Sequence, residues 1–312
     1  MTRTAGERYW ARLMLWQLTR SIVARNRKKM QEILENLARS YNEIVVKRVI
    51  EYAEKNDIAL LLYQALEEMG LEHTWLAQRL APLARTTIER IKHRDRLLAR
   101  TVEVLEENGV EYVIFKTFNM IGTVDVDIDL LIHPRDYKKT IKALLNKGFI
   151  PIDDIRKTYA TGFMIKQNPI ILDLHTEITV LGVPYIGKKT LLRHRNKIIH
   201  KTMEGNIIEL YTTDHVAEAL TRIAHAIIKE AEIKLDDLAE IHGTLKTGYE
   251  ELIRLTEMEA LELALITFIY RVNRALSMTI PAGTIGNKNN SSFLYSFVKD
   301  NAIRGNGVLP PY

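Results

Sequence analysis

The sequence predicts an α+β fold in which a mixed sheet with helices stands between two helical regions. Apolar residues recur at helical spacing through the first hundred residues, and the period changes to that of strands near residue 109. Helical spacing returns from about Thr212. We therefore expect a helical region over 1–108, a sheet region over 109–205, and a second helical region over 206–312 whose tail after Ser277 is irregular.

Helices are expected on both sides of the sheet region. A dense apolar run beginning at Ile58 predicts a helix that ends near Gly70. A stripe of Leu and Val predicts a second helix over about 86–107, and Gly109 suits its end because glycine accepts the left-handed conformation of a C-terminal cap. A late helix is expected over about 250–276.

Four strands and one helix are predicted between these helical regions. Short apolar or alternating runs, each bounded by turn-forming residues, mark the strands. Pro134 opens the intervening helix and Gly148 closes it. The predicted strands are Val110–Phe115, Val124–Ile132, Tyr159–Lys166 and Ile170–Ile178.

The second predicted strand carries alternating aspartates. Residues two apart in a strand point to the same face, so Asp125, Asp127 and Asp129 line one face. Carboxylates stacked in this way repel one another, and a divalent cation relieves the repulsion. The alternative is a solvent-facing strand that is merely acidic, since strands with one polar face are common. Asp125 is either a further ligand or the exposed start of the strand.

Two neighbouring segments favour a functional site. The first strand leads into Lys116 and Thr117, an ammonium and a hydroxyl that suit phosphate oxygens. In the strand after Ile170, Asp173 and His175 share a face between apolar residues. A carboxylate in such a run is expected to be paired, metal-bound or functional, because an unpaired buried carboxylate is costly. His175 either orients Asp173, contacts a substrate or is a hydrogen-bonded structural residue.

These segments resemble the nucleotidyltransferase superfamily with the DNA-polymerase-β-like palm. In one branch a strand ending in Lys-Gly precedes an Asp-Ile-Asp-Leu-Leu strand, and an Asp-Leu-His strand follows. The similarity covers about residues 45–245, including the helix with His225 and the later Asp-Asp pair. The matching segments here are Tyr112–Thr117, Asp127–Leu131 and Leu172–His175.

The resemblance implies a metal-dependent transferase that moves a nucleoside monophosphate from a nucleoside triphosphate, such as ATP, to a hydroxyl of RNA, protein or a small molecule. Asp127, Asp129 and Asp173 would be the catalytic residues and would bind Mg²⁺ or Mn²⁺. Asp173 would also accept the proton of the hydroxyl. Lys116 and Thr117 would contact the phosphates.

The chain also differs from that branch. Thr117 replaces the glycine that follows the lysine, the connection to the acidic strand is shorter, and Asp125 and Val126 stand where Arg-Ser is frequent. A bulkier residue at 117 hinders close approach of a phosphate to the backbone. One alternative is therefore a catalytically degraded module that binds nucleotide or nucleic acid. Another is a helical interaction protein with an exposed acidic strand.

A basic segment follows the Asp173 strand. Residues 178–203 contain no Asp or Glu, whereas the whole chain has a net charge of +5 and a pI near 9.1. The segment is either a surface for RNA or tRNA or a solvated face. Its candidate contacts are Lys188, Lys189, Arg193, Arg195 and Lys197.

Composition also limits the protein class. The 312 residues include no cysteine, which excludes disulfides and thiolate metal sites. Arg12 interrupts the first apolar stretch, so no secretory signal is expected. The apolar run over 261–270 is too short to span a bilayer. We expect a cytoplasmic protein without a membrane span.

Overall fold

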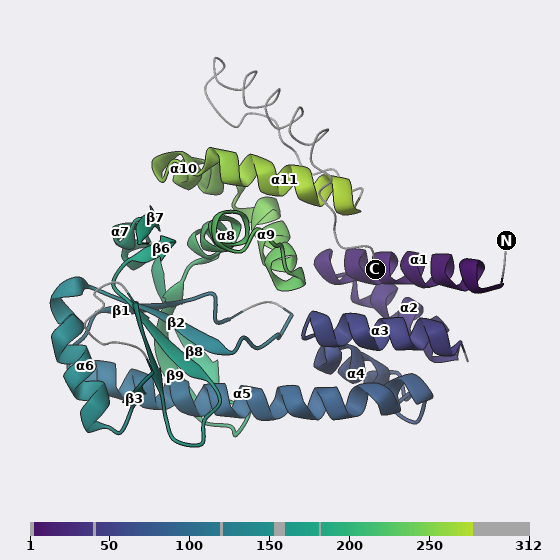
Figure 1. Cartoon of the computed structure of the whole chain (residues 1–312), viewed down its shortest axis with the longest axis horizontal. Coiled ribbons are helices and arrows are strands. Elements are labelled where there is room, and N and C mark those ends of the chain that lie inside the picture. Colours follow the sequence, from purple (N-terminus) through teal and green to yellow (C-terminus); the bar gives the residue numbers. More distant parts are fainter. Residues whose placement is uncertain (1–2, 40–41, 119–120, 153–159, 181, 277–312) are drawn as a thin grey trace, which may run out of the picture. The chain divides into compact units, whose positions relative to one another are not determined.

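The structure is a computed structural model, and it describes residues 3–39, 42–118, 121–152, 160–180 and 182–276. It divides into two compact units, Met1–Asp214 and His215–Tyr312. The first unit contains an N-terminal group of helices and a seven-stranded sheet (Figure 1). The second unit is helical in the part that is described. The expected α+β composition is thus confirmed.

Within the described residues, five helices precede the sheet, and the last of them links the helical group to the sheet. This helix, α5, spans 33 residues and begins well before the expected position near residue 86. Thr74 caps it by accepting a hydrogen bond from Ala77 N, and Pro82 lies inside it, where a proline normally marks a boundary. The helices are α1 (Arg3–Val23), α2 (Arg27–Arg39), α3 (Glu43–Lys55), α4 (Ala59–Glu68) and α5 (Trp75–Glu107).

The sheet is mixed, with strand order β3-β4-β5-β2-β1-β9-β8. Strand β2 is antiparallel to β1 and parallel to β5, while β9 is parallel to β1. The strands are β1 (Tyr112–Phe115), β2 (Asp127–Ile132), β3 (Ile150–Pro151), β4 (Ala160–Met164), β5 (Ile171–His175), β8 (Arg195–Lys201) and β9 (Ile207–Thr213). Between β5 and β8 lie the hairpin β6 (Ile178–Val180) and β7 (Val183–Ile186) and the short helix α7 (Lys188–Arg193).

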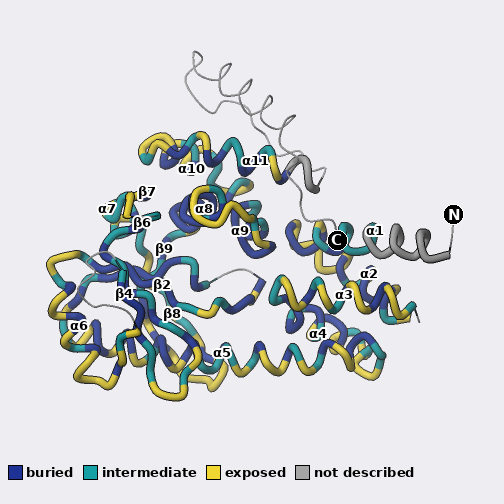
Figure 2. Tube along the Cα trace, viewed as in Figure 1, coloured by how far each residue is buried: buried dark blue, intermediate teal, exposed yellow. Residues whose placement is uncertain are grey.

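The main core lies between one face of this sheet and two helices, α5 and α6 (Tyr137–Asn146) (Figure 2). Alternate residues of β2, namely Ile128, Leu130 and Ile132, are buried in it. A 3₁₀ turn at Pro134–Asp136 leads into α6, as the proline predicts. Because side chains alternate along a strand, the aspartates of β2 project from the opposite face.

Two sequence expectations for this unit need correction. The acidic strand begins at Asp127 rather than Val124, so Asp125 precedes it. The segment from Thr212 is not yet helical, because β9 continues to Thr213 and pairs with both β1 and β8. Strand β9 has only a short pattern of alternating burial and directly precedes an apolar helix. The change from strand to helix spacing is therefore difficult to locate in the sequence.

The second unit begins with α8 (His215–Ala224), which passes into a π-helical turn at His225–Lys229. Helices α9 (Leu235–Thr247), α10 (Tyr249–Met258) and α11 (Glu262–Leu276) follow. The single helix expected over 250–276 is therefore two helices. The break is at Ala260, whose positive φ of 54° ends the helix without a glycine or proline to signal it. The expected irregular tail after Ser277 lies outside the described residues.

None of the helices within the described ranges has the length and apolar character that a bilayer span needs.

A buried arginine ties α8 to α9 in the second unit. Arg222 is 1% exposed, and its guanidinium bonds Glu218 at 2.8 Å, Asp236 at 2.8 Å and Asp237 at 3.1 Å. Asp237 also accepts a hydrogen bond from Lys234 N at the start of α9. Removing the arginine would leave several buried carboxylates without their cation.

Arg222→Met is expected to lower the free energy of unfolding by about 3–5 kcal/mol, because uncompensated buried charges are costly. Urea unfolding followed by circular dichroism measures the loss. Arg254→Met is the control, since Arg254 is 61% exposed in its ion pair with Glu251, and it should cost less than about 1 kcal/mol. Equal losses in the two variants would contradict a structural role for the buried cluster.

The stability of the chain should also depend on pH through Asp237. Burial and the neighbouring Asp236 charge raise the pKa of Asp237 to about 6, against the lowering effect of Arg222. A folded-state pKa above the unfolded value of about 3.9 means that Asp237 keeps its proton to a higher pH in the folded state than in the unfolded state. This contribution is therefore present below about pH 4 and is lost as the pH rises to about 6.

The wild type should accordingly lose stability relative to Asp237→Asn between these two pH values, as followed by urea unfolding at each pH. A constant difference between the two proteins across this range would refute the raised pKa.

Candidate active site

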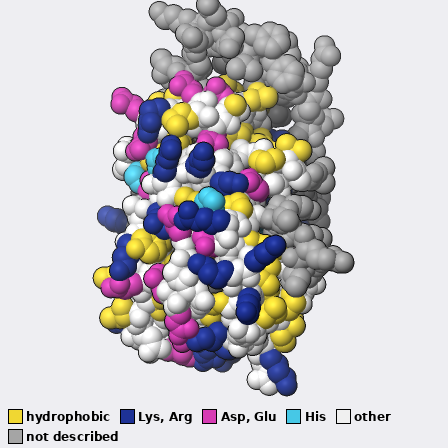
Figure 3. All heavy atoms as spheres, turned by 90° about the vertical axis from the view of Figure 1, so that its left-hand side faces the viewer, with side chains coloured by type: hydrophobic (Ala, Val, Ile, Leu, Met, Phe, Trp, Pro, Cys, Tyr) yellow, Lys and Arg dark blue, Asp and Glu magenta, His cyan; other side chains and the backbone are white. Residues whose placement is uncertain are grey.

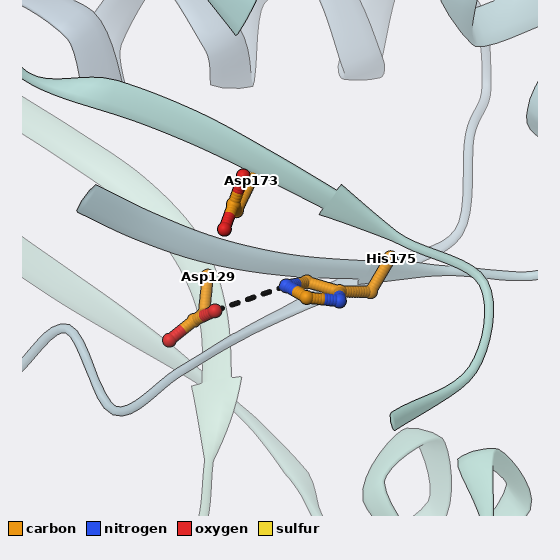
Figure 4. A group of neighbouring side chains, drawn as sticks. All are labelled: Asp129, Asp173 and His175. Carbon is orange, nitrogen blue, oxygen red and sulfur yellow. Dashed lines mark hydrogen bonds and ion pairs between the residues drawn. The ribbon is translucent and has the colours of Figure 1, made fainter. Parts of the chain in front are cut away.

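The parallel pairing of β2 and β5 brings two aspartates side by side. In this register Asp129 stands opposite Asp173, and Leu131 stands opposite His175. Neighbouring residues of paired strands project from the same face, so the side chains of Asp129, Asp173 and His175 gather on the face that α5 and α6 leave uncovered. Figure 4 shows these three side chains pointing toward one another.

The three side chains have the spacing of metal ligands. His175 Nε2 lies 3.0 Å from Asp129 Oδ1 (Figure 4). One ligand atom from each of Asp129, Asp173 and His175 lies within 4.8 Å of the other two. Ligands at about 2.1 Å from one ion are about 3 Å apart when adjacent and about 4.2 Å apart when opposite. Small side-chain rotations would therefore let all three contact one divalent cation.

A lysine contacts the same carboxylate from the other side. Lys116 directly follows β1, in which Phe115 pairs with Asp129. Its φ of 59° is unusual for a residue with a side chain. The Nζ atom lies 3.1 Å from Asp129 Oδ2. Asp129 is thus held between an ammonium and an imidazole.

These contacts keep Asp129 ionised although it is only 9% exposed. Burial alone would raise its pKa, but the Lys116 charge and the His175 hydrogen bond outweigh burial and hold the pKa well below its usual range. The Asp129 charge has the reciprocal effect on Lys116, whose pKa is raised despite burial. The pair is therefore an ion pair at neutral pH.

Asp127 lies one step along the same face of β2 and differs in its surroundings. Burial and the Asp129 charge raise its pKa to about 6, and the charge of Asp173 adds to the increase while Lys116 opposes it. Its carboxylate is thus within electrostatic range of both other aspartates. It is not one of the three residues with ligand atoms within 4.8 Å of one another, and its partner in β5 is Ile171.

The remaining expected site residues are placed less directly. Thr117 is 4% exposed, and its hydroxyl donates to Phe115 O at 3.2 Å. Asp125 is half-buried just before β2. His175 contacts Asp129 at 3.0 Å, a partner that the sequence hypotheses for this histidine did not name. Only the register between β2 and β5, which joins segments over forty residues apart, reveals this contact.

Much of the basic segment is engaged with acidic residues. Lys188 pairs with Glu177, Arg195 with Glu111 at 3.1 Å, and Lys197 with Glu209 at 2.5 Å. Among the described residues, Lys189 and Arg193 of α7 have no carboxylate partner. Figure 3, which faces the left-hand side of Figure 1, shows Lys and Arg side chains with Asp and Glu among them. Such mixed charge is typical of a solvated face as much as of a nucleic-acid surface.

Comparison by sequence finds no family and no curated protein that matches the chain. Solved structures similar to it include the following two. The antibiotic-resistance factor ANT(2'')-Ia is 12% identical with a TM-score of 0.37, over 60% of this chain and 98% of its own. An antigenic nucleotidyltransferase-like protein from Paracoccidioides brasiliensis is 10% identical with a TM-score of 0.37, over 63% and 96%. TM-scores this low assign no family, so the case for function rests on the geometry of the site.

Among the site variants, Asp129→Asn is expected to weaken Mn²⁺ binding most, because it removes the negative charge at the centre of the site. His175→Gln should raise the Mn²⁺ dissociation constant by about 10–100-fold, since Gln replaces the hydrogen bond but not the imidazole ligand. Titration followed by electron paramagnetic resonance measures both. His73→Gln, at an exposed turn, is the matched control. Unchanged affinity in both site variants would refute the metal site.

Proposed function

We propose that this protein is a metal-dependent nucleotidyltransferase, which transfers a nucleoside monophosphate from a nucleoside triphosphate to a hydroxyl group. The observation that carries this proposal is the convergence of Asp129 and Asp173, from two strands, with Lys116 bonded to the same carboxylate. Carboxylates suit Mg²⁺ or Mn²⁺, and an ammonium suits phosphate oxygens. The motif resemblance in the sequence points to the same chemistry.

The metal ions would polarise the α-phosphate and lower the pKa of the attacking hydroxyl. Asp127, Asp129 and Asp173 would hold these ions, with His175 as a further ligand. The acceptor oxygen forms a bond to the α-phosphorus, and the bond from that phosphorus to the bridging oxygen breaks. Pyrophosphate leaves, and Asp173 takes the proton of the hydroxyl.

Lys116 would help to bind the triphosphate. Its ammonium contacts Asp129 at 3.1 Å, and it would pair with phosphate oxygens bound beside that carboxylate. Thr117 would contribute by turning its hydroxyl from Phe115 O, to which it donates at 3.2 Å, to a phosphate oxygen, because phosphate oxygens accept hydrogen bonds. The acceptor would be RNA, protein or a small molecule.

The alternative is a module that binds nucleotide or nucleic acid without turnover. The observation in its favour is Thr117 at a position where a glycine would allow closer approach of a phosphate to the backbone. A site in which the carboxylates converged without a nearby lysine would fit this alternative better. The contact of 3.1 Å between Lys116 and Asp129 favours the enzyme.

The test is incubation with α-labelled nucleoside triphosphates, Mg²⁺ and cell extract, followed by detection of label on RNA, protein or small molecules. Asp127→Ala and Asp129→Asn should each lower labelling by at least about 100-fold, because groups that stabilise transition-state charge typically have effects of this size. Chelation of the metal should abolish it.

Asp136→Asn is the matched control, since Asp136 lies outside the site at the start of α6, where it pairs with Lys139 at 3.1 Å. Absence of labelling by the wild type with all four nucleotides, or labelling that survives in Asp129→Asn, would contradict the proposed function.

A further inference from the structure

Two arginines of α5 contact the two described ends of the connection between β1 and β2. Arg90 and Arg94 are four residues apart, so they lie one turn apart on the same side of the helix. Arg94 contacts Phe118, which follows Lys116 by two residues. Arg90 contacts Val124, which precedes Asp127 by three residues. One helix face therefore meets both segments that carry site residues.

The contacts of Arg90 hold the segment that leads into β2. Its Nη1 atom donates to both carboxylate oxygens of Asp57 at 2.8 and 2.9 Å, and its Nη2 atom donates to the carbonyl oxygen of Val124. The Val124 side chain is 1% exposed and packs with Leu60 and Ile91 of the N-terminal helices. Both the backbone and the side chain of Val124 are thus fixed by the helical group.

A second anchor follows directly. Ile171 N donates to the Val126 carbonyl oxygen at 3.0 Å, which attaches the start of β2 to β5. Between Val124 and Asp127 the chain consequently has little freedom to move. Both anchors lie within three residues of Asp127.

The contacts of Arg94 hold the other end. The Arg94 guanidinium carbon lies 5.5 Å from the centre of the Phe118 ring. The centre of the His200 ring lies 5.1 Å from the centre of the same Phe118 ring. Asp95 fixes Arg94 and His200, because its Oδ1 atom contacts Arg94 Nη2 at 3.0 Å and His200 Nε2 at 3.0 Å. Asp95 is 3% exposed, so the side chains that hold Phe118 are themselves anchored on a buried carboxylate.

We propose that Arg90 and Arg94 are positioning residues of the active site, with Arg90 fixing the segment that leads into Asp127 and Arg94 fixing the segment that follows Lys116. This inference rests on the proposed function, because it assigns Asp127 to the metal and Lys116 to the triphosphate. The two arginines act on different ligands and so have separable effects. Displacement of a site group by about 1 Å can cost about 100-fold in rate, which makes such supports measurable.

Arg90→Met and Arg94→Met separate the two effects in the full-length protein. Arg90→Met should raise the Mn²⁺ dissociation constant by about 10-fold and change the affinity for a non-hydrolysable ATP analogue less. Arg94→Met should raise the dissociation constant of the analogue by about 10-fold and leave Mn²⁺ binding within about twofold of the wild type. Arg90→Lys and Arg94→Lys should restore part of each loss.

Arg96→Met is the matched control. Arg96 lies on the same helix and pairs with Glu204, but its side chain is 54% exposed and it meets no site segment in its described ion pair. It should change neither affinity. Thermal unfolding of every variant shows whether a loss of affinity accompanies a general loss of stability.

Wild-type affinities in both arginine variants would overturn the inference. So would losses of both ligands in equal measure that follow the fall in melting temperature, because this is the result of a merely structural role. A wild type that binds Mn²⁺ and the analogue but transfers no nucleotide overturns the proposed function alone. A wild type that binds neither ligand overturns both.

Discussion

The buried carboxylate of Asp129 is the group on which the site depends. It is ionised in a place where burial disfavours charge, and Lys116 and His175 compensate it from opposite oxygens. Both contacts require particular neighbours in the sheet. The pairing of Phe115 with Asp129 brings the lysine, and the parallel pairing of β2 with β5 brings the histidine and Asp173. The pairing of the strands therefore also determines which charges surround Asp129.

The surrounding elements can be understood from this constraint. Helices α5 and α6 bury one face of the sheet, and the aspartates of β2 project from the other. Helix α5 also extends beyond the sheet into the N-terminal helices, and its side chains reach Phe118 and Val124. The N-terminal helices consequently support the acidic strand as well as their own core. The buried Arg222 cluster stabilises the second unit independently.

Local pattern was enough to predict which acidic side chains share a face on a single strand. The alternation around Asp127 and Asp129 predicts one acidic face, and the apolar residues flanking Asp173 predict a strand with a functional carboxylate. Even so, the strand begins later than its alternation indicates, because pairing with β5 starts at Asp127. The long helix α5 was predicted only in its later part, because Pro82 hides its continuity.

Contacts between distant segments could not be predicted in this way. The partner of His175 depends on the register of two strands, and the partners of Arg90 and Arg94 depend on how a helix crosses the sheet. Neither is encoded in a local period. The break at Ala260 has the same character, since no glycine or proline marks it.

The central claim is that acidic side chains from β2 and β5 share one cation. Crystals grown with Mn²⁺ and a non-hydrolysable nucleoside triphosphate test it most directly, through the anomalous scattering of manganese. The account predicts an anomalous peak at about 2.0–2.3 Å from carboxylate oxygens of Asp129 and Asp173, with triphosphate oxygens beside it. Manganese bound elsewhere, with these carboxylates directed away from it, would contradict the account.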